Sequence, residues 1–192
     1  MPNGAATAPL VGALGLLGRA IDYTRASLRL VTSEALTRPT PCRRWDLGAL
    51  LRHMHDSLGT LHEAGAVGYV ALEPAEPGPG EIVSALRSRA CDLLGAWSRN
   101  DGSELISVAG CPLTAGVLAS TGALEVAVHG WDVARACGVR RPLPPELAAE
   151  LLELVPLLVS DRDRPARFAA PVDVPPLAPA GDRLLAFLGR QP

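Results

Sequence analysis

Lysine is absent from this sequence of 192 residues: all 18 basic residues are arginines, and they are scattered. Together with 20 acidic residues they leave a net charge of −2. Nucleic-acid binding needs basic side chains gathered on one face, where they neutralise phosphates. We therefore expect no nucleic-acid partner. The use of Arg without Lys, with abundant Ala, Gly and Pro, is typical of a GC-rich coding sequence.

Long apolar runs and paired cysteines are also missing. The stretch VGALGLLG at 11–18 is shorter than the ~20 residues of a membrane span, and no basic residue precedes it, so it predicts an amphipathic helix rather than a signal peptide. The cysteines are Cys42, Cys91, Cys111 and Cys137. They form no CxxC pair, and no secretion signal supports disulfides. We expect a cytoplasmic protein with reduced thiols and no membrane partner.

What the sequence contains is helical periodicity, with apolar residues recurring about every 3.6 positions. The segments predicted as helices are 10–31, 46–65, 81–98, 114–137, 145–159 and 181–189. Strand signals are thin, apart from a short extended stretch within 100–112. Four long helices with connections that are not all tight predict an all-α four-helix bundle. We expect residues 1–140 to form the bundle and residues 141–192 a short helical and Pro-rich C-terminal extension that packs on it within a single structural domain.

The predicted helix at 114–137 has polar side chains on one face. Glu125, His129 and Asp132 follow one another at intervals of four and three residues, so they share that face. A carboxylate and an imidazole one turn apart can chelate one ion, as in metalloprotease helices. The alternative is a solvated stripe, on which Asp132 is a surface carboxylate or a partner of Arg135.

A histidine from the predicted helix at 46–65 would complete a set of two imidazoles and one carboxylate, which leaves open positions for water or substrate. This helix carries His53, His55 and His62. His53 lies on one flank of its apolar side and His55 on the other, so a straight helix cannot bring both to one ion. Periodicity does not choose between them. His55 and His62 are more simply solvated or capping residues than a second site.

Two motifs and the C-terminal tail resemble one known family. PTPCRRWDLGALLRHM, at 39–54, is similar to the start of the second helix in the mycothiol-dependent maleylpyruvate isomerase-like branch of the DinB/YfiT-like superfamily, where a P-x-P-C-x-x-W turn precedes a His eight residues after the Trp. LEVAVHGWDVARACG, at 124–138, resembles the E-x3-H-G-W-D-x-A-R-x-x-G signature of the same branch. The tail from 167 to 192 looks like the C-terminal extension usual there.

The resemblance implies a four-helix bundle with a divalent ion at one end of its core. Mapped onto this sequence, the metal ligands are His53, Glu125 and His129, and this choice of His53 over His55 comes from the resemblance. Zinc is the expected ion, with nickel and iron as alternatives. The resemblance also implies mycothiol, a low-molecular-weight thiol, as a candidate cofactor.

Residues around the ligands have expected roles too. Asp132 is expected behind them as a catalytic neighbour, accepting an imidazole N–H or positioning Arg135. Arg43, Arg44 and Arg52, near the start of the second helix, are candidates for binding an acidic, sugar-linked thiol, although exposed arginines are common.

The function predicted from these features is a metal-dependent transferase or isomerase that uses a thiol and acts on a small molecule. A site of two neutral imidazoles and one carboxylate keeps a net charge near +1, which lowers the pKa of a bound thiol or water. One alternative is a thiol-independent lyase, cyclase or isomerase of a specialised biosynthetic pathway. Another is a non-catalytic metal-binding protein. Either a monomer or a homodimer fits.

Overall fold

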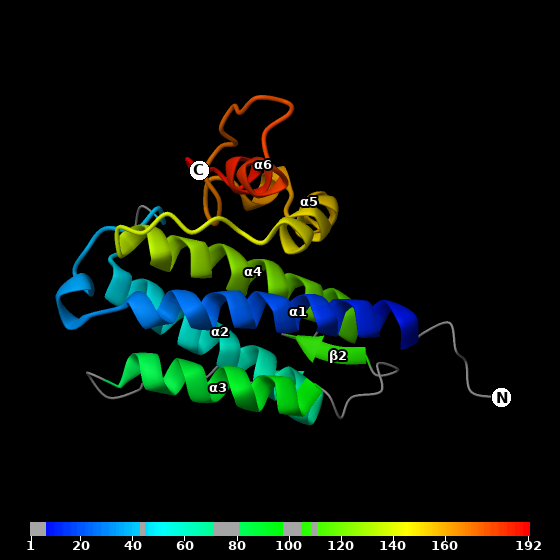
Figure 1. The fold of residues 1–192 in the computed structure, drawn as a ribbon. Helices are drawn as coiled ribbons and strands as arrows, with labels where there is room; N and C mark the ends of the chain where they lie inside the picture. Colours follow the sequence, from blue (N-terminus) through cyan, green and yellow to red (C-terminus); the bar gives the residue numbers. More distant parts are fainter. Residues whose placement is uncertain (1–6, 43–44, 71–80, 98–104, 109–110) are drawn as a thin grey trace.

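Four long helices form the body of the molecule in the computed structural model, which describes residues 7–42, 45–70, 81–97, 105–108 and 111–192 (Figure 1). The helices are α1 (Thr7–Ser27), α2 (Leu47–Val67), α3 (Ile82–Trp97) and α4 (Ala115–Ala136). Each lies where the apolar periodicity predicts a helix, and the all-α prediction is confirmed. The first helix ends earlier than expected, because the chain tightens into 3-10 turns at η1 (Leu28–Leu30) and η2 (Ser33–Ala35).

The direction of α2 relative to α4 places the candidate ligands together. His53, early in α2, contacts Glu125 of α4, while Leu61, later in α2, lies against Gly122. Rising numbers on one helix thus meet falling numbers on the other, so the two helices are antiparallel. Figure 1 shows α1 beside α4 and running in the same direction as it.

Helix α3 packs along α2 and runs parallel to it. The side chain of Arg89 covers Gly59, and further along both helices the indole N–H of Trp97 donates to the carbonyl of Leu61 at 2.9 Å. Trp97 is fully buried in this contact.

A small sheet closes the end of the bundle where α2 ends and α4 begins. It consists of β1 (Tyr69–Val70), β2 (Leu105–Val108) and β3 (Cys111–Thr114). The order is β1-β2-β3, with β1 parallel and β3 antiparallel to β2. The thin strand signal in this part of the sequence reflects strands of two to four residues, too short for an alternating pattern.

The C-terminal part of the chain lies over α4 (Figure 1) and contains α5 (Pro145–Leu158), η3 (Asp161–Asp163) and α6 (Ala180–Phe187). Its apolar side chains join the core: Leu147, Leu151 and Leu184 are fully buried. An ion pair of 2.6 Å between Arg19 and Glu150 links α1 to α5. None of the helices described has the length and apolarity required to cross a membrane.

Candidate metal centre

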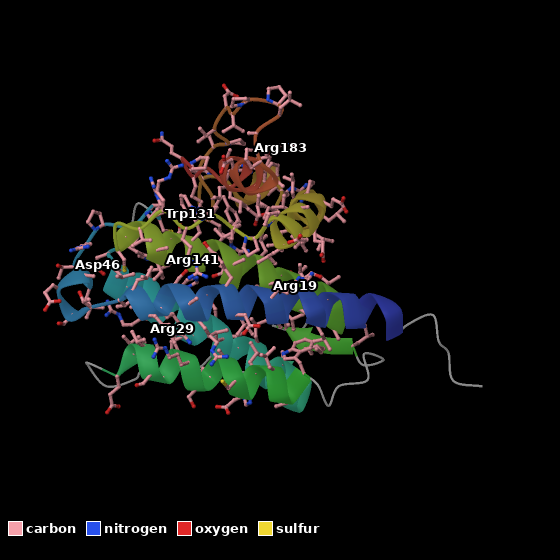
Figure 2. All side chains as sticks on the ribbon, in the orientation of Figure 1. Arg19, Arg29, Asp46, Trp131, Arg141 and Arg183 are labelled. Atoms are coloured by element: carbon pink, nitrogen blue, oxygen red, sulfur yellow. The ribbon has the colours of Figure 1, made fainter. Side chains whose placement is uncertain are left out.

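The turn before α2 is held by short hydrogen bonds. The Thr40 hydroxyl lies within 3.0 Å of the carbonyl of Cys42 and within 2.9 Å of that of Trp45. Asp46 then caps the helix by accepting from the backbone N–H of Ala49 at 2.7 Å (Figure 2 labels Asp46). The turn and cap thereby fix where α2 begins, and they place Trp45 beside the candidate ligands.

Three side chains converge in the half of the bundle away from the sheet. His53 Nε2 lies 2.5 Å from Glu125 Oε1, and His129 Nε2 lies 3.2 Å from the same oxygen. One ligand atom from each residue lies within 4.8 Å of the others. The side chains of His53 and Glu125 are about one-third exposed, at 34% and 31%, whereas His129 is buried at 7%. The cluster is therefore accessible through His53 and Glu125, while His129 lies on its buried side.

The charges of this cluster depend on one another. Burial would raise the pKa of Glu125, but His129 and His53 outweigh it and hold that pKa well below its ordinary range. Burial would lower the pKa of His129, but Glu125 and Asp132 raise it to about 9. Two imidazole nitrogens aimed at one carboxylate oxygen need either N–H groups that donate to it or a cation between the nitrogens and the oxygen. The same three side chains can therefore hold protons or a divalent cation.

Asp132 lies behind His129 and is fully buried. A carboxylate only accepts, so the contact of 2.9 Å assigns a proton to Nδ1 of His129, while Nε2 faces the cluster. Arg190 donates to the same carboxylate from Nη2 at 2.8 Å and from Nε at 3.3 Å. Burial would raise the pKa of Asp132, but Arg190 and His129 lower it. Asp132 therefore stays ionised.

The cluster opens into a cavity of about 410 Å³. Its walls are largely apolar and include Leu124, Val128 and Phe168. The Trp45 ring lies over the cluster, with its centroid 4.5 Å from that of His53. Cys42 and Arg167 also line this space. The cavity has the size of a small-molecule site.

The remaining sequence candidates lie elsewhere. His55 is buried at 4%, which corrects the expectation of a solvated residue, and it faces away from the cluster, with burial and then Arg89 lowering its pKa. Arg52 is exposed on α2 and does not line the cavity. Arg43 and Arg44 fall outside the described residues.

Two contacts of the site were not predicted from the sequence. Asp132 pairs with Arg190 rather than with Arg135, which stacks over the Trp131 ring at 5.5 Å. Arg190 closes the stretch DRLLAFLGR, and Gly189 before it has a φ of +78°, a conformation that suits glycine and turns the chain back toward α4. Only the family-like tail marked this region, and it assigned Arg190 no role.

Comparison with known proteins finds a matching family model, a relative and a solved structure. The family model for the mycothiol maleylpyruvate isomerase N-terminal domain matches residues 17–134. An uncharacterized protein of Mycobacterium tuberculosis, found in two strains, is 32% identical over 177 residues, which cover 90% of this chain and 94% of the relative. The crystal structure of the mycothiol-dependent maleylpyruvate isomerase matches with a TM-score of 0.54 and 19% identity, over 74% of this chain and 67% of that one, and it shows a shared fold.

Proposed function

The chain belongs to the mycothiol maleylpyruvate isomerase N-terminal domain family, as its motifs predicted, and from this premise we propose that it is a divalent-metal-dependent enzyme that uses a low-molecular-weight thiol to transform a small molecule. The observation that carries the proposal is the cluster of His53, Glu125 and His129 at the base of a cavity of about 410 Å³. Thiol transfer or isomerisation is the proposed class of reaction.

The donor set fits a transition-metal ion. Two imidazoles and one carboxylate suit zinc, which we propose as the ion, and nickel and iron are the alternatives. His53 and Glu125 are partly exposed, so a ligand from the cavity has access to the same centre. Once bound, the ion supplies Lewis-acid chemistry, lowering the pKa of a thiol or polarising an oxygen of the substrate.

The residues behind the cluster orient it. We assign Asp132 the role of holding the Nδ1 proton of His129, which keeps the Nε2 lone pair directed at the ion. Arg190 neutralises the buried charge of Asp132 and keeps this carboxylate in place. The largely apolar walls lower the polarity around the cluster, which strengthens electrostatic interactions inside the cavity.

A thiol-independent lyase, cyclase or isomerase is the second candidate, and the charges of the described cavity favour it. Among the described lining residues the cations besides the histidines are Arg167 and Arg190. Arg167 lies 3.6 Å from Asp163, and Arg190 is committed to Asp132. Little cationic surface therefore remains for an acidic thiol, unless the predicted Arg43 and Arg44 supply it.

Metal content tests the first half of the proposal. Protein purified without added metal should contain about one equivalent of divalent ion by elemental analysis, and a chelator should lower its melting temperature. His53→Ala should lose the ion and His55→Ala should keep it. A wild-type protein with no stoichiometric ion, and with no rise in melting temperature on adding zinc, contradicts the metal site.

Calorimetry with mycothiol tests the second half. Metal-loaded wild-type protein should bind mycothiol, and the metal-free His53→Ala variant should bind it at least tenfold more weakly. A full complement of metal without any heat of thiol binding would instead select the thiol-independent enzyme.

A further inference from the structure

A second cavity, of about 270 Å³, lies at the C-terminal end of α4 on the face away from the metal centre. Three of its lining residues are arginines: Arg135, Arg140 and Arg141. Trp131, which also lines it, lies two positions after His129, so the two side chains leave the helix on roughly opposite faces. Figure 2 labels Trp131 and Arg141 in this region. No residue proposed for metal chemistry lines this space.

Aromatic rings hold two of the arginines in place. The guanidinium carbon of Arg141 lies 4.8 Å from the centre of the Tyr23 ring, and that of Arg135 lies 5.5 Å from that of Trp131. The Tyr23 hydroxyl donates to the backbone carbonyl of Arg141 at 2.7 Å. Burial raises the pKa of Tyr23 to about 12, so this donor keeps its proton. Two of the three cationic groups are therefore positioned before any ligand arrives.

These arginines are not paired with acids in the described part of the protein. Within it, none of the three has a carboxylate within 4.0 Å, whereas Arg19 and Arg190 are paired. The carbonyl groups near the C-terminal end of α4 already accept hydrogen bonds from the backbone, so they do not need the arginines as donors. The backbone N–H groups of Cys137, Gly138 and Val139 donate to them over 2.9 to 3.0 Å. Three guanidinium charges thus remain available to a ligand.

We propose that this cavity binds a small oxyanion with two or more negative charges, of the phosphate or polycarboxylate class. Planar guanidinium groups match the oxygens of such groups, and three of them at one cavity suit a multiply charged ligand rather than a single carboxylate. Asp182 also lines the cavity, and its carboxylate accepts a hydrogen bond from a hydroxyl or amine on the same ligand. This inference does not depend on the metal centre.

The three tryptophans make the test specific to one site. Trp131 lines the arginine cavity, Trp45 lies at the metal centre, and Trp97 is buried between α2 and α3. Inorganic phosphate is titrated into ¹⁵N-labelled full-length protein at constant ionic strength, and the indole N–H signals are followed by NMR. The Trp131 signal should shift and saturate, while the Trp97 signal should not move.

Variants separate a site from general charge screening. Arg135→Gln and Arg140→Gln should each weaken phosphate binding at least tenfold, and Arg183→Gln, an exposed arginine of α6 outside the lining, should leave it unchanged. The absence of a saturable Trp131 shift overturns the proposal, as does equal weakening by Arg183→Gln. A shift of Trp45 alone places phosphate at the metal centre and also overturns it. His53→Ala should retain the Trp131 shift, so failure of the metal proposal is recognised separately.

Discussion

The interface between α2 and α4 has two halves that differ in chemistry although the same pair of helices makes both. In the half near the sheet, Leu61 packs onto Gly122 so closely that a Cβ at this glycine would lie 2.7 Å from its methyl group. In the other half, His53 faces Glu125 and His129 beside a cavity of about 410 Å³. One half is filled with apolar side chains, and the other holds a polar cluster beside a cavity.

The difference shows how one bundle separates stability from chemistry. Close packing of buried apolar groups stabilises the fold, and interiors leave few voids. A polar cluster beside a cavity contributes less to packing, and its charged groups cost free energy to bury unless they are paired. The packed half therefore supports the open half, and substitutions in the two halves should have different consequences.

The largest effect is expected in the open half. Glu125→Gln keeps the shape of the side chain but removes the negative charge that the two imidazoles share. We expect metal affinity to fall at least a hundredfold in a competition assay with a chromogenic chelator, with the circular dichroism spectrum unchanged. His62 lies on α2 outside the three-residue cluster, so His62→Gln is the matched control and should bind metal normally. Wild-type affinity in Glu125→Gln would contradict the ligand assignment.

The packed half should respond in stability instead. Leu61 is buried at 6%, and Leu61→Ala removes its contact with Gly122. We expect the free energy of unfolding to fall by about 3 kcal/mol in urea denaturation, as buried Leu→Ala changes typically do. Metal stoichiometry should remain that of the wild type. A loss of metal at temperatures where the variant is folded would show that the two halves are not separable.

Substitution of Arg190, which lies behind the metal ligands, should have an intermediate effect on metal affinity. Arg190→Gln leaves the buried Asp132 without its charge partner, so the orientation of His129 is less well held. We expect metal affinity to fall about tenfold, the lower end of the range for residues behind metal ligands. Arg190→Lys should recover part of the loss, and Arg183→Gln should cause none. Equal affinity in the Gln and Lys variants at the wild-type value would remove Arg190 from the site.

The smallest effect concerns His55, which lies only two residues from His53 but on the other side of α2. Its pKa is lowered by burial and by Arg89, so the unfolded chain binds a proton at a higher pH than the folded protein does. Stability from this group is present above its ordinary pKa and is lost as the pH falls below it. The unfolding free energy of His55→Gln should decline less than that of wild type between neutral pH and pH ~5. Parallel pH profiles would contradict this.

The helices were predictable because each is encoded locally. Apolar spacing marks the buried face of every long helix, and Asp46 marks the start of α2 as its N-cap. The spacing of Glu125 and His129 likewise places both on one face of α4, whatever that face packs against. The small sheet was only weakly marked, since its strands are two to four residues long and β1 pairs with β2 from a distant part of the sequence.

The helices, the bundle class and the Glu125–His129 face could be predicted from local spacing, because they depend on neighbours within one or two turns. Periodicity leaves the two flanks of α2 equivalent, and the choice of His53 over His55 came from the family resemblance. The packing of the helices is what turns the His53 flank toward α4 and buries the His55 flank elsewhere. It also decided that Asp132 pairs with Arg190, 58 positions away, rather than with nearby Arg135. Contacts of that kind arise from how elements pack, and no local spacing encodes them.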